Sequence, residues 1–191
     1  MKKTLALVVL CTSCAYSQPY LRTPEGRVEH QCTPPALVGV SPEFSIEQRD
    51  AIQRAVEYWN YAIGAHVLAS LGDVPFTSPA AETGGFVLVY LSDGEYAFRR
   101  GVPVNGVARM HIHKKTGCIV ISSIEMARAA LDDIGMFETM IRHELGHVLG
   151  LRDTYLDTSR LMNHRIDTSR QHPMDARQSE IDALRKIYNR D

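Results

Sequence analysis

The chain has 191 residues, of which 45% are hydrophobic and 23% are charged; this length and composition suit one globular domain with a substantial core. The formal net charge of −1 provides no general attraction to nucleic acid or to acidic membranes, so we expect neither as a partner. Arg99 and Arg100 form a short basic pair, which we interpret as solvated surface.

The first residues have the pattern of an export signal. Two lysines follow the initiator methionine, an apolar run covers Leu5–Leu10, and Ala15 and Ser17 occupy the −3 and −1 positions of a cleavage site. We therefore expect residues 1–17 to be a signal peptide and the mature protein to be secreted. The apolar run is much shorter than the ~20 residues that a membrane-spanning helix needs, and we predict no transmembrane segment elsewhere.

Cys14 leaves an alternative destination open. The segment LCTSC, which ends at Cys14, loosely resembles a bacterial lipoprotein signal. In that case Cys14 would be lipidated and would anchor the protein to a bacterial cell envelope. Cys11 stands where such signals normally have leucine, which favours plain secretion.

The segment behind the signal peptide carries few apolar residues. Residues 18–35 contain four prolines, which indicates an extended N-terminal segment. From there we predict a single domain over residues 36–191, beginning with a short strand at 36–40. A helix follows at about 45–63, where a Ser-x-x-Gln capping box precedes an apolar stripe at helical spacing that contains Trp59.

A group of strands is predicted after the first helix. Glycines and prolines between residues 72 and 85 indicate a loop. Two continuous apolar runs, 86–91 and 117–122, read as buried strands, and alternation over 106–113 reads as a half-exposed strand.

Two helices complete the predicted domain. The first begins near Gly135 and ends at Gly150, and the second covers roughly 175–188, where isoleucine, leucine and tyrosine side chains form an apolar face. The order helix, strands, helix, helix predicts an α+β fold with a mixed sheet.

The chemistry of the sequence is concentrated in the helix that ends at Gly150. His143 and His147 are four residues apart, so both imidazoles leave the same helix face. Glu144 lies beside them without sharing that face. The His-Glu-x-x-His pattern provides two zinc ligands and a general base.

A third ligand is expected just beyond the helix. Gly150 can adopt the left-handed conformation that reverses the chain, and Asp153 can then return its carboxylate to the metal. Catalytic zinc needs three protein ligands and an open position, and His143, His147 and Asp153 provide the three. Asp157 lies four residues farther on, beyond the point where the turn faces the metal.

The segment HELGHVLGLRD resembles the extended zinc motif of the metzincin metallopeptidases. Aspartate at the third ligand position is similar to the snapalysin-type members, and the matrixins and astacins are more distant relatives. The resemblance implies a twisted mixed sheet, a zinc-site helix, a methionine turn at Met162 that packs beneath the zinc, and a C-terminal helix. His164 stands where astacin-like members carry a tyrosine that reaches the zinc, so it is a candidate additional ligand or transition-state group; a solvent-exposed loop histidine is the alternative.

The resemblance also implies an activity. We expect a zinc-dependent endopeptidase, a monomer that hydrolyses protein or peptide substrates by zinc-activated water, with Glu144 as general base. An extended substrate would pair with the edge strand near Val107–His111, and the loop between Met162 and Met174 would shape the pocket. Two alternatives stay open: a catalytically silent zinc-binding module, and a toxin-like protease with a narrow target.

Cys32 and Cys118 remain in the chain under either export route. Two cysteines in an exported protein most simply form one disulfide bond. The alternative is that Cys32 is a thiol that blocks the zinc from a short inhibitory segment, which would leave Cys118 unpaired.

Overall fold

The computed structural model describes residues 19–74, 85–99, 101–155, 157, 159–165 and 173–189. The predicted signal peptide and Cys14 therefore lie outside the described residues. The elements in chain order are β1 (His30–Gln31), β2 (Ala36–Val40), α1 (Ile46–Ile63), β3 (Leu68–Asp73), β4 (Phe86–Leu91), β5 (Ala97–Arg99), β6 (Val102–Val104), β7 (Gly106–His113), β8 (Cys118–Met126), a 3-10 helix (Arg128–Ala130), α2 (Ile134–Val148) and α3 (Gln178–Tyr188). In these parts of the chain, no helix has the length and apolar character needed to cross a membrane.

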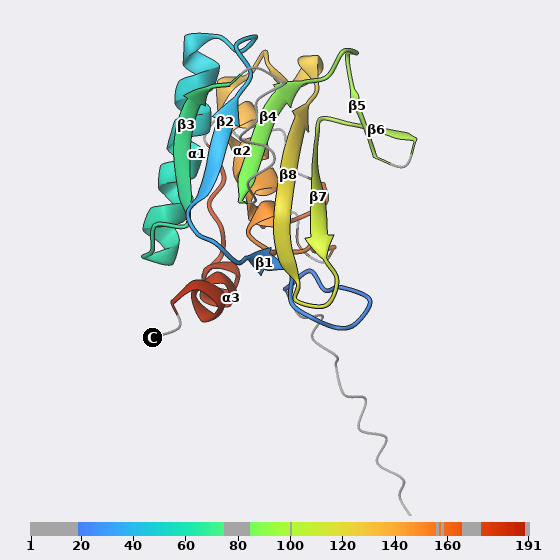
Figure 1. Ribbon diagram of the computed structural model, residues 1–191. Helices are drawn as coiled ribbons and strands as arrows, with labels where there is room; N and C mark the ends of the chain where they lie inside the picture. Colours follow the sequence, from blue (N-terminus) through green and yellow to red (C-terminus); the bar gives the residue numbers. More distant parts are fainter. Residues whose placement is uncertain are drawn as a thin grey trace, which may run out of the picture.

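Within the described residues, six strands form one mixed sheet. Its path is β1-β8-β4-β2-β3, and β7 pairs with β8 in addition. The five strands of the path run parallel to their partners, whereas β7 is antiparallel to β8. Because β4 and β1 pair with successive parts of β8, β7 takes the other side of β8 and forms an edge of the sheet (Figure 1). The mixed sheet predicted from the sequence is confirmed.

Helices α1 and α2 cover one face of this sheet (Figure 1). Helix α1 begins at the predicted capping box, in which Ser45 and Gln48 each bond to the other's backbone amide, and it ends at Gly64 with a left-handed φ of 78°. Trp59 is fully buried, and its indole nitrogen donates to the carbonyl of Arg142 in α2 at 2.8 Å. The tryptophan therefore joins α1 to the helix that carries the histidines.

Several elements differ from the sequence-based expectation. Strand β3 was not predicted, because only Leu68 is buried in it and no alternation marks it. Strand β8 extends to Met126, four residues beyond the predicted end, with buried Ile124 and Met126 continuing the pattern. Helix α3 begins at Gln178, because Arg177 has extended backbone and acts as the N-cap, with its amide bonded to the Glu180 carboxylate.

The N-terminal segment packs against the domain along residues 19–31, which we call the N-terminal strap. Tyr20 forms an antiparallel bridge with Leu151, and β1 continues the sheet beside the start of β8. The structure also contains the expected disulfide bond between Cys32 and Cys118, so the blocking-thiol interpretation of Cys32 is wrong. The strap is thus tied to the sheet at its C-terminal end.

Candidate metal centre

Helix α2 presents two histidines to a cleft while its other side is buried. The Asp133 carboxylate caps the helix by accepting from the amide of Met136. Phe137, Ile141 and Leu145, which follow one another at helical spacing, are fully buried in the core. His143 and His147 are 6% and 7% exposed, so their rings reach solvent only through the cleft.

Each of these rings is held by a backbone carbonyl. Nδ1 of His143 lies 2.7 Å from the carbonyl oxygen of Leu161, and Nδ1 of His147 lies 2.8 Å from that of Leu151. In a neutral imidazole, Nδ1 is then the donor and Nε2 carries the lone pair. Histidines that bind metals are commonly held in this way.

Asp153 places a third acceptor against the two histidines. Its Oδ1 atom lies 3.4 Å from Nε2 of His143 and 3.3 Å from Nε2 of His147, and Oδ1 is buried without a hydrogen-bond partner. Three lone pairs therefore converge, and the three ligand atoms lie within 4.8 Å of one another. Two imidazoles and one carboxylate suit Zn²⁺, with a coordination position left open.

The turn after α2 brings Asp153 back to the histidines. Gly150 has φ of 107°, which confirms the left-handed residue expected there. A side chain at Gly150 would also overlap the carbonyl oxygen of Glu29 in the N-terminal strap. The strap and the turn are joined by hydrogen bonds of 2.8 Å from the Leu21 amide to the Gly150 carbonyl and from the Arg152 amide to the Pro19 carbonyl.

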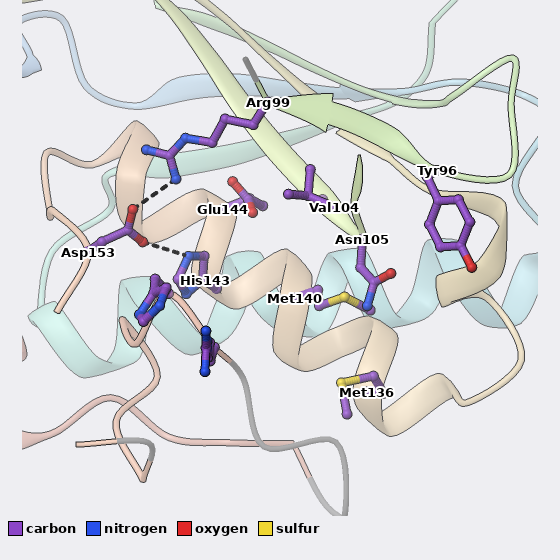
Figure 2. Close-up of a pocket in the computed structure, with 12 residues that line it drawn as sticks. Tyr96, Arg99, Val104, Asn105, Met136, Met140, His143, Glu144 and Asp153 are labelled. Atoms are coloured by element: carbon purple, nitrogen blue, oxygen red, sulfur yellow. Dashed lines mark hydrogen bonds and ion pairs between the residues drawn. The ribbon is translucent and has the colours of Figure 1, made fainter. Parts of the chain in front are cut away.

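Glu144 lies beside the three converging groups and outside them. Its Oε2 atom accepts a hydrogen bond of 2.7 Å from the amide of Ala108 in the edge strand β7. The carboxylate also lies close to Gly106, where an added Cβ would be 3.3 Å from Oε1. A carboxylate is therefore available to accept a proton next to the metal position (Figure 2).

Met162 packs beneath the histidine helix. The methionine is fully buried, and a Cβ at Gly146 would be only 2.5 Å from its sulfur atom. Its carbonyl accepts from the amide of Thr154 at 2.7 Å, which joins the methionine turn to the loop that carries Asp153. Gly146 was not singled out from the sequence, although a glycine inside an apolar helix was a signal of close packing.

His164 and Asp157 take different places near the site. The His164 ring stacks on Tyr155 with centroids 4.4 Å apart and lines the cleft. Asp157 instead pairs with Arg177 at 2.6 Å and accepts from Ser159, and the hydrogen bonds from Ser159 lower its pKa. The structure therefore keeps Asp157 outside the converging group, as expected.

The other histidines do not join the group. His66, His111 and His113 are exposed, and His30 is partly buried near the Val28 carbonyl. His172 lies outside the described residues.

Arg99 was missed by the sequence analysis. Arg99 is exposed, as expected, but its Nη1 atom also lies 2.9 Å from Oδ2 of Asp153. The contact raises the pKa of Arg99. Burial alone would raise the pKa of Asp153, but the two neighbouring imidazoles and the hydrogen bond from Arg99 hold it well below its usual range.

A cleft of about 550 Å³ extends from the converging groups. Met136 and Met140 of α2 form an apolar wall, and Tyr96 and Asn105 lie on the side of the β5–β6 hairpin (Figure 2). The cleft is large enough for a side chain next to the metal position.

Comparisons with known proteins find similar structures but no similar sequences among protein families and curated proteins. No protein-family model and no curated protein matches the sequence. Archaemetzincin from Methanopyrus kandleri has a similar structure, with a TM-score of 0.52, 16% identity, and coverage of 84% of this chain and 97% of that chain. High choriolytic enzyme 1, a hatching enzyme zinc-protease from the medaka Oryzias latipes, aligns with a TM-score of 0.45, 15% identity, and coverage of 92% and 96%. The archaemetzincin similarity shows a metzincin-like fold.

Proposed function

We propose that the protein is a secreted zinc-dependent endopeptidase. The observation that carries the proposal is the convergence of His143 Nε2, His147 Nε2 and Asp153 Oδ1, with the Glu144 carboxylate beside them and an open cleft in front. Three acceptors without a donor between them suit a cation. A purely structural site would need neither an open position nor a neighbouring base.

Glu144 is the proposed general base. Zinc, when bound, lowers the pKa of a water to roughly 7 and polarises the peptide carbonyl. Glu144 accepts the proton of the attacking water and returns it to the leaving amine. In the described structure the Glu144 carboxylate accepts a hydrogen bond from the Ala108 amide. This bond holds the carboxylate at the edge strand, beside the metal position.

The substrate is proposed to be an extended peptide lying along β7. The Ala108 amide points into the cleft towards Glu144 rather than to β8, so the edge strand offers backbone groups on its cleft side. Such groups bind an extended chain by adding a strand to the sheet. We further propose that His164, which lines the same cleft, lies close enough to the reacting carbonyl to assist turnover.

Export is proposed to follow the signal at residues 1–17. The disulfide between Cys32 and Cys118 supports this route, because disulfides persist in oxidising compartments. Mass spectrometry of the mature N-terminus tests it: a chain beginning at Gln18 supports secretion, and a lipidated Cys14 would show anchoring to a cell envelope instead.

The test of the proposed function is Glu144→Gln. The amide has nearly the same shape but cannot accept the proton, so cleavage of casein should fall by roughly 10²–10⁴-fold while bound zinc is unchanged. Glu57→Gln on the exposed face of α1 is the matched control. Undiminished cleavage by Glu144→Gln would exclude Glu144 as the base.

The unsubstituted protein should cleave casein, and a chelator should abolish the cleavage. Zinc binding without any cleavage would favour a silent module or a narrow target. A proteome-wide cleavage screen then distinguishes those two, since a narrow-target protease still yields a cleaved protein.

A further inference from the structure

Arg99 reaches the converging groups from the opposite side of the cleft. It is the last residue of β5, next to the turn of the β5–β6 hairpin, whereas Asp153 lies in the loop after α2. Figure 2 shows the guanidinium directed at the carboxylate. The Arg99 side chain is 57% exposed and that of Asp153 is 6% exposed, so a largely solvated cation contacts a buried anion.

The two oxygens of Asp153 are divided between two different neighbours. Oδ2 accepts from Nη1 of Arg99 at 2.9 Å, while Oδ1 faces the two histidine nitrogens and has no hydrogen-bond partner. The arginine therefore leaves the metal-facing oxygen free. Its contact is compatible with a metal ion bound to Oδ1.

The other two ligands show why such a contact matters. His143 and His147 project from a helix, and carbonyls of the neighbouring loops hold their Nδ1 atoms. Asp153 lies on a loop, where no helix fixes its backbone, and its carboxylate can rotate about the Cβ–Cγ bond to offer either oxygen. For Asp153, the hydrogen bond from Arg99 takes the part that the backbone carbonyls take for the two histidines.

We propose that Arg99 is a positioning residue for Asp153, which holds Oδ2 so that the carboxylate offers Oδ1 alone to the metal. This inference rests on the proposed function, because it takes His143, His147 and Asp153 as zinc ligands. Arg99 itself binds neither zinc nor substrate in this role. Groups that orient metal ligands in this way typically change metal affinity by 10–100-fold when they are removed.

Orientation and electrostatic repulsion predict opposite effects for the loss of Arg99. A guanidinium near Zn²⁺ repels it, so a purely electrostatic role would make zinc bind more tightly after Arg99→Gln. A positioning role makes zinc bind more weakly. Because the arginine is more than half exposed, solvent screens its repulsion, whereas its direct contact with the buried carboxylate is not replaced. We expect the positioning effect to dominate.

The experiment measures zinc affinity directly, by competition with a chromophoric chelator on the full mature chain. Arg99→Gln should weaken zinc binding by about tenfold or more. Arg99→Lys keeps the charge but loses the planar fork, so it should resemble Arg99→Gln. Arg49→Gln, which breaks another arginine–aspartate ion pair, between the partly exposed side chains of Arg49 and Asp73, should leave the affinity unchanged. Equal or tighter zinc binding by Arg99→Gln would overturn the inference.

The same Arg99 substitution in a second variant distinguishes positioning of Asp153 from a general effect of Arg99 on folding. In an Asp153→His chain there is no carboxylate for Arg99 to hold, so adding Arg99→Gln should not weaken zinc binding further. Zinc should even bind slightly more tightly, because the positive charge of Arg99 is gone. Equal weakening in both backgrounds would overturn the inference and point to a structural role. If Arg99→Gln weakens zinc binding only in the chain that keeps Asp153, the inference is supported. If that same protein cleaves no peptide, the proposed peptidase function is contradicted while the inference stands. Failure of the unsubstituted chain to bind zinc would overturn both.

Discussion

At the level of single atoms, the candidate metal centre depends on which lone pairs are already used. Leu161 and Leu151 carbonyls engage the Nδ1 atoms of the two histidines. The remaining Nε2 atoms and Oδ1 of Asp153 converge without a donor among them. Such an arrangement is costly in a buried site unless a cation occupies it, which is why we expect metal binding to stabilise the fold as well as enable chemistry.

Asp153 and Asp157 should respond differently to removal. Asp153→Ala eliminates one of three ligands and should lose most of the zinc and all proteolysis. Asp157→Ala should keep both, because Asp157 pairs with Arg177 and lies outside the converging group. Metal analysis after dialysis, alongside casein cleavage, tests this pair. If Asp153→Ala keeps stoichiometric zinc, His164 becomes the next candidate for the third ligand.

Gly146 should not tolerate alanine, although alanine normally favours a helix. The added Cβ would lie 2.5 Å from the sulfur of Met162 and 3.2 Å from Cζ2 of Trp59. Overpacking of this kind costs about 1–3 kcal/mol, so thermal denaturation should show a lower Tm. Gly94→Ala is the control, since its nearest neighbour would be 3.7 Å away. An unchanged Tm for Gly146→Ala would show that Met162 can move aside.

At the level of elements, the sequence predicted those parts whose signal is periodic. Helix α2 lies within a residue or two of its predicted bounds, because its apolar stripe and the glycine at its end are both local signals. The turn that returns Asp153 was predicted for the same reason. The β5–β6 hairpin was not predicted, because its two strands of three residues are too short to establish a pattern.

The contact between Arg99 and Asp153 shows what a sequence alone does not contain. The two residues are separated by 54 positions, and neither spacing nor composition relates them. The same limit applies to the N-terminal strap. Its contacts with Gly150 and Arg152 are made by backbone groups, which every residue carries, so the residue types of 19–31 give no sign of where they dock.

Helix α3 should provide a pH-dependent contribution to stability through Glu180. Its carboxylate caps the helix by accepting from the Arg177 amide at 2.8 Å, but it is only 2% exposed, and burial raises its pKa above 4.5. The folded state therefore binds this proton more tightly than the unfolded state. The stabilising contribution is fully present below about pH 4.5 and is lost as the pH rises through the folded-state pKa.

Glu180→Gln removes this dependence while it keeps an oxygen for the cap. The Tm of the variant relative to the unsubstituted protein should be higher at pH 8 than at pH 4, by a few degrees at roughly 2–4 °C per kcal/mol. Calorimetry at the two pH values measures the difference, and Glu57→Gln on exposed α1 surface is the control. A Tm difference that is the same at both pH values would contradict the role assigned to burial.

At the scale of the whole molecule, the metal centre is assembled from distant parts of the chain. The histidines come from α2, the methionine turn lies beneath them, β7 holds Glu144, and the N-terminal strap holds the turn that carries Asp153. Gln31 extends the strap's contacts through a hydrogen bond of 3.2 Å to the Val148 carbonyl. The disulfide then links the strap to the sheet, so covalent structure far from the zinc ligands restrains the loop that supplies one of them.

This connection predicts two effects of replacing both disulfide cysteines, as Cys32→Ser/Cys118→Ser. The bond joins residues separated by 86 positions, and in the chain-entropy model its loss costs about 4 kcal/mol. The Tm should therefore fall by about 10 °C. Because the untethered strap holds the Gly150 turn less firmly, zinc should also dissociate faster to a chelator at temperatures well below the Tm. Reduction of the unsubstituted protein is the matched comparison and should give the same two changes. A lower Tm with unchanged zinc release would show that the strap stabilises the fold without positioning Asp153.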